Sequence, residues 1–452
     1  MSKAVLDIHD KPTAGQLITF SFQHMFAMFG STILVPKLVG LSPAMALLTS
    51  GIATIIFLLV TQFKVPAYLG SSFAFIMPIQ TVVALDAAGI ATTPGNAMIG
   101  SMIVGLVYAI VALLIWKTGY KWLMNILPPI VVAPVIIVIG LGLSGTAVDM
   151  AMNITVDQLN ETTGEMEEVK QYSGLHFSAA MVTLIAAIIF NLFFKNILSA
   201  MPILLGIVVG YIYSTVIGIV DFTAVKSASF FQMPDFLIPG VHYEFTITSA
   251  IIFAMVPVVI VTISEHIGHQ LVLGKVVNRN YVKDPGLHRS ILGDGLGTFA
   301  SALIGGPPKT TYGENIGVLA ITRVYSVYVI LGAAVLAIII SFSGWLMAVV
   351  QTIPTAVLGG ISILLFGIIA SSGLRMFVEN KVDFGNNRNM VIASVILVIG
   401  IGGAKIDTMM GGFHFEIGGM ALASIVGVLL NLIIPGREKA ESDIYETQEE
   451  IK

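Results

Sequence analysis

The sequence predicts an all-α polytopic membrane protein with 14 transmembrane segments, arranged as two inverted repeats of seven spans. Composition supports the first part, because 56% of the 452 residues are hydrophobic and only 11% are charged, against roughly 25% charged residues in soluble domains. Apolar stretches of about 20 residues, long enough to cross a hydrocarbon core of roughly 30 Å, recur from end to end. The placement of basic residues supports the number of spans, and a weak sequence similarity between the two halves supports the inverted repeat.

The number of spans comes from counting apolar segments, several of which are short or interrupted by Gly and Pro. They begin near Ile18, Ala44, Ala67, Ala97, Met124, Phe177, Ala200, Ser249, Ile291, Ile316, Tyr325, Leu346, Met390 and Ile417. An even number of spans puts both termini on one side. With the termini inside, 17 of the 22 basic residues fall in inner segments, which obeys the positive-inside rule. The other five are Lys37, Lys170, Lys226, Lys309 and Lys405.

The ends and the overall charge exclude several classes of protein. The N-terminal 16 residues are polar and acidic and lack the pattern of a cleaved secretory signal. Residues 437–452 form a charged stretch, which we expect to be a cytoplasmic tail. The net charge of −4 does not indicate a nucleic-acid partner. The absence of cysteine from the sequence excludes disulfides, thiolate catalysis and Cys-ligated metals.

The two halves resemble each other on either side of a basic loop, Gly274–Ser290. Leu127–Gly145 and Ile353–Gly373 both start with an apolar residue and Pro, and both end in Ser-Gly. Halves of seven spans have opposite topology, and inverted repeats mark secondary transporters with a site near the bilayer midplane. The alternative is that Gly- and Pro-rich apolar helices resemble each other by chance.

Two segments that should be helical are interrupted, at Pro66–Pro78 and Ile304–Gly317. Proline removes a backbone donor and glycine weakens a helix, so neither can be one continuous spanning helix. They are the third and tenth spans, which correspond under a seven-span repeat and therefore point to a transport site. A half-helix beginning near Phe73 or Gly313 leaves free N–H groups with a partial positive charge. The alternative is a kink that only assists packing.

Two glutamates, Glu265 and Glu314, fall inside predicted spans. A charge at that depth costs about 2.5–3.5 kcal/mol on insertion scales, so such residues are functional candidates. His269 lies four residues after Glu265, on the same helical face, where the two side chains can hydrogen-bond. His266 points elsewhere, and we expect it to be a packing residue. The histidine spacing hints at a metal, but HExxH and a third ligand are missing, so no metal site is predicted.

Residues 314–323, ENIGVLAITR, fully match the signature of the nucleobase–ascorbate transporter family, also called nucleobase–cation symporters. The Gln-His pair of that family's first span is present as Gln23-His24. The stretches PAYLGSSFAF, SEHIGHQ, DPGLHRS, TTYGENIGVLAITRVYS and ASSGLR resemble the bacterial uracil permease branch over nearly the whole chain.

This resemblance implies a fold of core and gate domains. The core (substrate-binding) domain would hold spans 1–4 and 8–11, at residues 13–118 and 245–344. The gate domain would hold spans 5–7 and 12–14, at residues 119–244 and 345–436. Spans 3 and 10 would each contain a short strand leading into a half-helix. Members of this branch are proteins of the bacterial plasma membrane and are often homodimers.

By the same resemblance, the activity would be uracil import coupled to proton symport through an elevator-like movement of core against gate. The implied substrate-binding residues are Glu265, Glu314, Phe73, Gly313, Tyr312, Ser72, Ser31 and Phe366. The implied proton-coupling residues are His269, Glu265 and Glu314. The partners would be uracil, protons and membrane lipid, with no nucleic acid and no cofactor.

Two departures and three alternatives remain. Lys309 stands where relatives have a small polar residue, and is interpreted either as a lysine at the outer rim or as a charge that alters the entrance. Phe366 stands where relatives have Tyr. A purine carrier for xanthine or urate is the nearest alternative, although Glu at position 314 favours pyrimidines. An anion exchanger or channel is disfavoured by the two glutamates, and an enzyme by the lack of a nucleophile, metal set or cofactor motif.

Overall fold

The computed structural model describes residues 4–84, 91–159, 166–195, 197–410 and 413–436. Seven helical segments in these ranges are long and apolar enough to cross a membrane: Ala14–Leu38, Pro43–Val60, Pro94–Thr118, Pro129–Met152, Gly174–Phe193, Ser249–Val277 and Thr355–Glu379. Five shorter apolar helices accompany them: Phe73–Val82, Pro202–Val216, Val327–Ser341, Asn387–Ile401 and Gly419–Ile433. The prediction of a polytopic helical membrane protein is therefore confirmed, while the count of fourteen spans stays a prediction.

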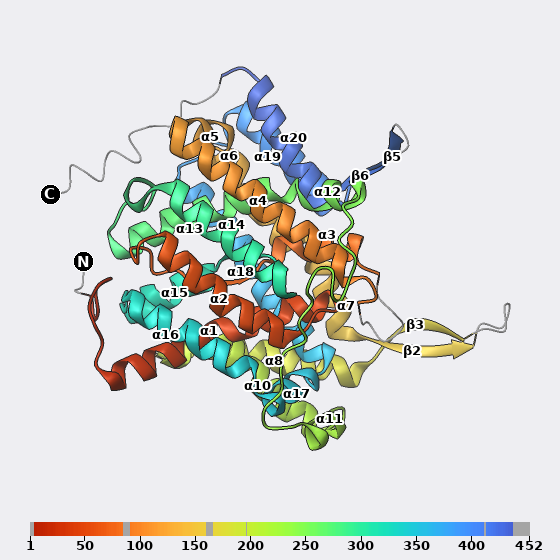
Figure 1. Ribbon diagram of the computed structural model, residues 1–452. Coiled ribbons are helices and arrows are strands. Elements are labelled where there is room, and N and C mark those ends of the chain that lie inside the picture. Colours follow the sequence, from red (N-terminus) through yellow and green to blue (C-terminus); the bar gives the residue numbers. More distant parts are fainter. Residues whose placement is uncertain (1–3, 85–90, 160–165, 196, 411–412, 437–452) are drawn as a thin grey trace.

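Figure 1 shows the order of the elements. The first half contains α1 (Ala14–Leu38), α2 (Pro43–Val60), β1 (Leu69–Ser71), the 3₁₀ turn η1 (Phe73–Phe75), α3 (Ile76–Val82), α4 (Pro94–Thr118), α5 (Lys121–Ile126), α6 (Pro129–Gly142), α7 (Ser144–Met152), β2 (Asn153–Leu159), β3 (Met166–Tyr172), α8 (Gly174–Phe193), α9 (Ile197–Ala200), α10 (Pro202–Val216) and α11 (Thr223–Ser227). Proline opens α2, α4, α6 and α10, a position at which its missing N–H costs no helical hydrogen bond.

The second half begins after a long irregular connection. It contains α12 (Ser249–Met255), α13 (Val258–Val277), the π turn η2 (Val282–Gly286), α14 (Leu287–Ile304), β4 (Lys309–Thr311), α15 (Gly313–Thr322), α16 (Val327–Ser341), α17 (Gly344–Gln351), α18 (Thr355–Glu379), α19 (Asn387–Ile401), β5 (Lys405–Met410), β6 (Phe413–Gly418) and α20 (Gly419–Ile433). The tail predicted at 437–452 lies outside the described residues.

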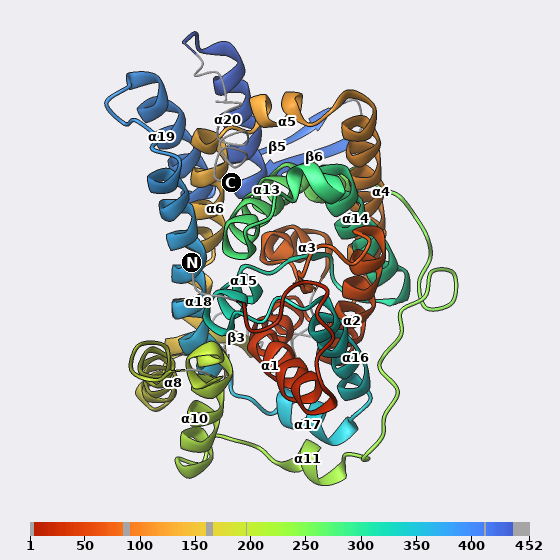
Figure 2. The same cartoon turned by 90° about the vertical axis from the view of Figure 1, so that its left-hand side faces the viewer.

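The helices pack in two groups, each drawn from both halves of the chain. In the first group, α14 packs against α2 and α4, and α16 packs against α1 and α2. In the second group, α18 packs against α6, α7 and α8, while α19 packs against α6 and α20. Figure 2 shows the second group on the left and the first on the right. We call them the α14 group and the α18 group.

The echo between Leu127–Gly145 and Ile353–Gly373 corresponds to two helices, α6 and α18, that touch. A Cβ on Gly373 would lie 2.6 Å from the carbonyl oxygen of Ala133 on α6. In the other direction, a Cβ on Gly140 would overlap the carbonyl oxygen of Phe366 on α18. Glycine at both positions therefore allows the two backbones to approach closely, as small residues do in membrane helix packing.

The two interrupted segments meet in the middle of the molecule. β1 and β4 pair antiparallel, with Leu69 opposite Thr311 and Ser71 opposite Lys309. The pairing is extended at both ends, because Ser72 N donates to Pro308 O at 2.9 Å and Tyr312 N donates to Tyr68 O at 3.0 Å. Backbone polar groups without a helical partner must be satisfied within the protein at membrane depth. Each broken segment thus supplies the hydrogen bonds that the other lacks.

Two further hairpins were not predicted. β2 pairs with β3 in the acidic connection after α7, and β5 pairs with β6 before α20. Both project from the right-hand ends of the helices in Figure 1.

Candidate functional site

A cavity of about 590 Å³ lies where the two helix groups face each other. Its wall on the side of the α14 group includes six of the nine predicted site residues: Phe73, Glu265, His269, Tyr312, Gly313 and Glu314. The opposite wall comes from the α18 group and from α10, which packs against α8 and α18, and it mixes apolar with polar residues. Its apolar part includes Ile136 on α6, Ile203 on α10, and Ile368 and Met376 on α18. Residues from both halves of the sequence are therefore brought to one site.

The broken segments present helix N-termini to this cavity. The 3₁₀ turn η1 begins at Phe73 and α15 begins at Gly313, at the positions that the sequence indicated. N–H groups in the first turn of a helix have no intrahelical acceptor, so both ends can donate to a bound oxygen. A Cβ on Gly313 would lie 3.0 Å from His269 Nε2, so glycine leaves the space that the imidazole needs.

Glu265 and Glu314 both line this cavity, but they differ in their hydrogen bonds. Glu314 Oε1 accepts a hydrogen bond from Ser31 Oγ at 3.0 Å. Glu265 lies on α13 and is 9% exposed. Its Oε2 has no hydrogen-bond partner among the described residues. A buried carboxylate oxygen without a partner is costly, and both glutamates therefore offer acceptor capacity to a ligand.

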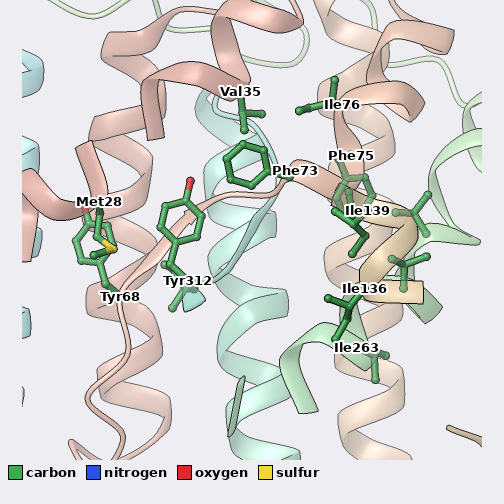
Figure 3. Packing of buried hydrophobic residues seen from close by; sticks show 14 of the residues in the cluster. Met28, Val35, Tyr68, Phe73, Phe75, Ile76, Ile136, Ile139, Ile263 and Tyr312 are labelled. Carbon is green, nitrogen blue, oxygen red and sulfur yellow. The ribbon is translucent and has the colours of Figure 1, made fainter. Parts of the chain in front are cut away.

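Aromatic rings form one side of the site. The rings of Phe73 and Tyr312, which Figure 3 shows next to each other, have centroids 6.3 Å apart and planes at 26°. Phe366 meets Phe73 edge-on, with ring centroids 5.9 Å apart. Tyr312 OH donates to the Ser71 carbonyl at 2.9 Å, which fixes its ring. A Cβ on Gly70 would overlap that ring. The result is a flat apolar surface beside the polar groups.

The three remaining predicted residues, Ser31, Ser72 and Phe366, lie behind the lining. Ser31 acts on the cavity through Glu314, and Phe366 through Phe73. Ser72 is fully buried, and its hydroxyl has no hydrogen-bond partner among the described residues. None of the three has a direct contact with the cavity in this conformation.

His266 is buried and packs edge-on against Phe57, as expected for a packing residue, but its ring is also hydrogen-bonded, which the sequence did not predict. Its Nδ1 lies 2.8 Å from Asp294 Oδ2 and its Nε2 lies 2.9 Å from Ser290 Oγ. His269 also bonds differently from the expected pairing with Glu265, because its Nδ1 lies 3.3 Å from Thr311 Oγ1. Helical spacing shows which residues share a face, but it cannot show that α14 and β4 supply the nearer partners.

The interpretation of Lys309 as a lysine at the outer rim is wrong, while an effect of its charge on the entrance stays a prediction. The side chain is 1% exposed and is neither at the outer rim nor part of the cavity lining. Its Nζ donates to Ala46 O at 3.0 Å, Ser50 Oγ at 2.9 Å and Ser71 Oγ at 3.5 Å. The three ammonium hydrogens thus find three oxygens. Because Lys309 is buried, it no longer counts among the basic residues of the outer segments, and the excess of basic residues in the inner segments is larger.

Asn315 is a structural member of the site that the sequence analysis did not single out, although it belongs to the ten-residue signature. His24 Nδ1 donates to its Oδ1 at 3.1 Å, and its Nδ2 donates to Pro66 O at 3.0 Å. It therefore ties α1, α15 and the chain leading to β1 together. Its place next to Glu314 in the signature was the signal that could have identified it.

Fold and site together define a membrane transporter, with a cavity that contains buried carboxyl groups between two groups of spanning helices. Residues 15–409 match the model of the family described as the Permease family, and the chain belongs to that family. It is 60% identical over 446 residues to the uracil permease of Bacillus caldolyticus, covering 99% of this chain and 98% of that one. It is 55% identical to the uracil permease of Bacillus subtilis (strain 168), covering 98% of each chain.

A more distant relative is the uracil permease of Escherichia coli (strain K12), 40% identical over 96% of this chain and 94% of that one. These matches confirm the resemblance to the nucleobase–ascorbate transporter family and its bacterial uracil permease branch. They also confirm that the chain is a transporter rather than an enzyme and a multi-pass protein of a bacterial membrane.

Among solved structures, the transmembrane domain of the cyanobacterial bicarbonate transporter BicA matches with a TM-score of 0.63 at 15% identity, over 95% of this chain and all of that one. SLC26A9 matches with a TM-score of 0.66 at 9% identity, over 92% of this chain and 64% of that one. At such identities the likeness concerns the fold alone.

Proposed function

We propose that this chain imports uracil together with a proton. The observation that carries the proposal is the meeting of two glutamates and two helix N-termini at one cavity beside a flat aromatic surface. The names of the relatives support the substrate, since those at 40–60% identity are uracil permeases.

The cavity matches the hydrogen-bonding edge of uracil. Neutral uracil alternates N–H donors with carbonyl acceptors around a flat ring. Glu265 and Glu314 would accept from the N–H groups, while the backbone N–H groups of Phe73 and Gly313 would donate to the carbonyls. Because Ser31 occupies Glu314 Oε1, the other oxygen of that carboxylate is left for the ligand. The ring would lie along Phe73 and Tyr312, as aromatic faces prefer.

The same cluster supplies a place for a proton to enter. Glu265, Glu314 and His269 are the carboxyl and imidazole groups of the lining nearest the broken helices. Moving two uncompensated carboxylates at membrane depth is costly, and taking up one proton lowers that cost. Uracil binding and proton uptake would thereby favour the same movement, which is the requirement for symport.

The two helix groups support an elevator-like movement. We propose that the α14 group corresponds to a core domain at 13–118 and 245–344. The α18 group would be the gate at 119–244 and 345–436. The cavity-lining residues that we propose for substrate binding come from the core side, and the gate side adds a mixture of apolar and polar residues, so sliding one group against the other would carry the site across. The antiparallel pairing of β1 and β4 fits two repeats of opposite topology.

The cavity also extends to Lys275, Arg279 and Arg375, which the positive-inside rule places on the cytoplasmic side. We therefore assign an inward-open state, with both termini cytoplasmic. With α14 and α15, the twelve apolar segments described above would complete fourteen spans. By the family resemblance we also propose a homodimer, which native mass spectrometry of the detergent-solubilised protein would test.

Transport in proteoliposomes tests the proposal. Labelled uracil should accumulate when the outside is acidified, and a protonophore should abolish that accumulation. Unlabelled uracil should compete better than xanthine or urate. Stronger competition by xanthine or urate would show that the substrate is a purine instead of uracil. Uptake that ignores the proton gradient would refute symport, and uptake of bicarbonate or chloride in place of uracil would favour an anion exchanger.

A further inference from the structure

A buried polar cluster that the transport site does not use lies between α13 and α14. It consists of His266, Asp294 and Ser290, joined by contacts of 2.8 Å from His266 Nδ1 to Asp294 Oδ2 and 2.9 Å from His266 Nε2 to Ser290 Oγ. All three side chains have no exposed surface. The arrangement has the order of a hydrolytic triad, but a hydroxyl sealed from the cavity cannot attack a substrate. Its chemistry is therefore limited to holding protons.

One hydroxyl connects this cluster to the transport cavity. Thr311 Oγ1 lies 3.4 Å from His266 Nδ1 and 3.3 Å from His269 Nδ1. His269 in turn lines the cavity and points its Nε2 at Gly313. A continuous path thus leads from the cavity through His269 and Thr311 to His266 and Asp294. Both contacts of Thr311 are at the long end of the hydrogen-bond range, so a small movement of β4 would open or close the path.

The cluster can satisfy its hydrogen bonds in two protonation states. Ser290 Oγ lies 3.1 Å from Leu287 O and 2.9 Å from His266 Nε2. When its hydrogen turns to Leu287 O, Ser290 accepts from a protonated Nε2. When the hydrogen turns to His266, Nε2 needs no proton. Asp294 Oδ1 has no hydrogen-bond partner among the described residues, which leaves a second oxygen at which a proton can be held.

The groups around the cluster do not supply a competing cation. Tyr108 on α4 bonds to Thr262, while Glu265 and His269 lie on α13 itself. Lys309 on β4 directs its ammonium to α2 instead, and Glu314 lies across the cavity on α15. On α14 itself, His288 and Arg289 precede Ser290, and the Arg289 guanidinium donates to Val60 O at 3.3 Å. The turn η2, which packs on α14, carries Lys283 beside Asp284. The described residues of α2, α6, α12 and α20, which also pack on α13 or α14, carry no titratable side chain. The charge of Asp294 is therefore balanced chiefly by His266.

We propose that the His266–Asp294 pair is the place where the coupled proton is held during transport, reached from the cavity through Thr311. This inference rests on the proposed function of uracil–proton symport and deepens it. It removes a conflict in the site, because a glutamate that carries the proton loses an acceptor that uracil needs. A proton held behind the cavity leaves both carboxylates free to bind the ligand.

The transfer balances at every atom. His269 takes a proton at Nε2 from the cavity and releases its Nδ1 proton to Thr311 Oγ1. His266 Nδ1 first gives its proton to Asp294 Oδ2, and the vacated Nδ1 then takes the hydroxyl proton of Thr311, with Asp294 Oδ1 left to accept from it. The net change is one proton taken from the cavity and one gained by the pair, whose charge rises by one. The reverse sequence returns the proton.

The sharpest test removes the hydroxyl of Thr311 and leaves its shape. Thr311→Val keeps a β-branched side chain, which suits a strand, and Thr311→Ser keeps the hydroxyl as the matched control. Three readouts are needed in the same preparation: uracil binding, uracil–uracil exchange at equal pH, and accumulation with the outside acidified by one unit. For one proton per uracil that gradient supports about tenfold accumulation. His266→Gln and Asp294→Asn supply independent variants of the pair.

We expect Thr311→Val, His266→Gln and Asp294→Asn to bind and exchange uracil while losing the tenfold accumulation, and Thr311→Ser to retain it. Accumulation at the wild-type level by Thr311→Val or His266→Gln would overturn the proposal. A uniform loss of binding, exchange and uptake in both variants would also overturn it, since that outcome marks a structural role. If uracil accumulation by the wild type does not depend on the proton gradient, the failure lies in the proposed symport and not in the proton pathway through Thr311.

Discussion

Glu314→Gln should raise the Kd for uracil about 100-fold, and the size of the loss depends on Ser31. In the wild type, Ser31 Oγ donates to Glu314 Oε1 at 3.0 Å. The other oxygen is then free for a uracil N–H. A glutamine that keeps its oxygen on Ser31 turns its NH₂ group towards that N–H, so a donor faces a donor. Losing a charge-assisted bond and orphaning a buried donor costs about 3 kcal/mol, and every 1.4 kcal/mol is tenfold.

The Ser31→Ala background makes this reasoning testable. Without Ser31 the glutamine amide can rotate and present its oxygen to uracil, so only the charge contribution is lost. The effect of Glu314→Gln should then fall to about tenfold, or roughly 1.4 kcal/mol. Ser31→Ala alone should cost about 1 kcal/mol, the value of one ordinary hydrogen bond. The two substitutions should therefore be strongly non-additive, as expected for residues in direct contact.

Binding of labelled uracil to the purified protein measures all four members of this cycle. Glu379→Gln is the matched control, because Glu379 lines the cavity away from the helix N-termini and pairs with Lys275 at 3.2 Å and Arg375 at 3.3 Å. Its effect on the Kd should be small. The reasoning would be refuted by wild-type affinity in Glu314→Gln, or by an equal penalty for that change with and without Ser31.

Five further substitutions, at four positions, test other parts of the structure. Lys309→Met should leave thermal stability unchanged or higher, since it removes a buried charge and keeps volume, whereas Lys309→Ala should lose about 2–5 kcal/mol to a cavity; equal melting curves for the two would contradict this. Asn315→Ala should lower the melting temperature, because His24 Nδ1 and Pro66 O are orphaned at about 1–3 kcal/mol each, and a wild-type melting curve would rule out the bridging role. Tyr312→Phe should weaken uracil binding by only about 1 kcal/mol because the ring remains, whereas Gly70→Ala should weaken it more by displacing the ring; binding measurements in the reverse order would show that the hydroxyl, not the ring, matters.

Local sequence patterns predicted much of the site. Proline and glycine cannot continue a membrane helix, so the breaks before Phe73 and Gly313 could be read directly from the residues. The cost of a charge in lipid singled out Glu265 and Glu314 before any geometry was known. These features belong to short stretches of chain, and for that reason they did not depend on which helices pack together.

Other features depended on neighbours from distant parts of the chain. His266 looked like a packing residue until α14 placed Asp294 and Ser290 around its ring. Lys309 looked like a surface lysine until α2 placed Ala46 and Ser50 at its ammonium. In both cases the partner lies more than 20 residues away. No helical or strand period extends across such a separation.

The sequence established a chain built for the membrane, with broken helices, buried acids and the signature of a nucleobase carrier, because composition, backbone propensity and short motifs are properties of neighbouring residues. The tertiary structure decided which groups face each other: that β1 pairs with β4, that both glutamates line one cavity, and that a histidine and an aspartate lie linked behind it. Such pairings arise from the packing of helices that are far apart in sequence, and the energy of a buried polar group is set by the partners which that packing supplies.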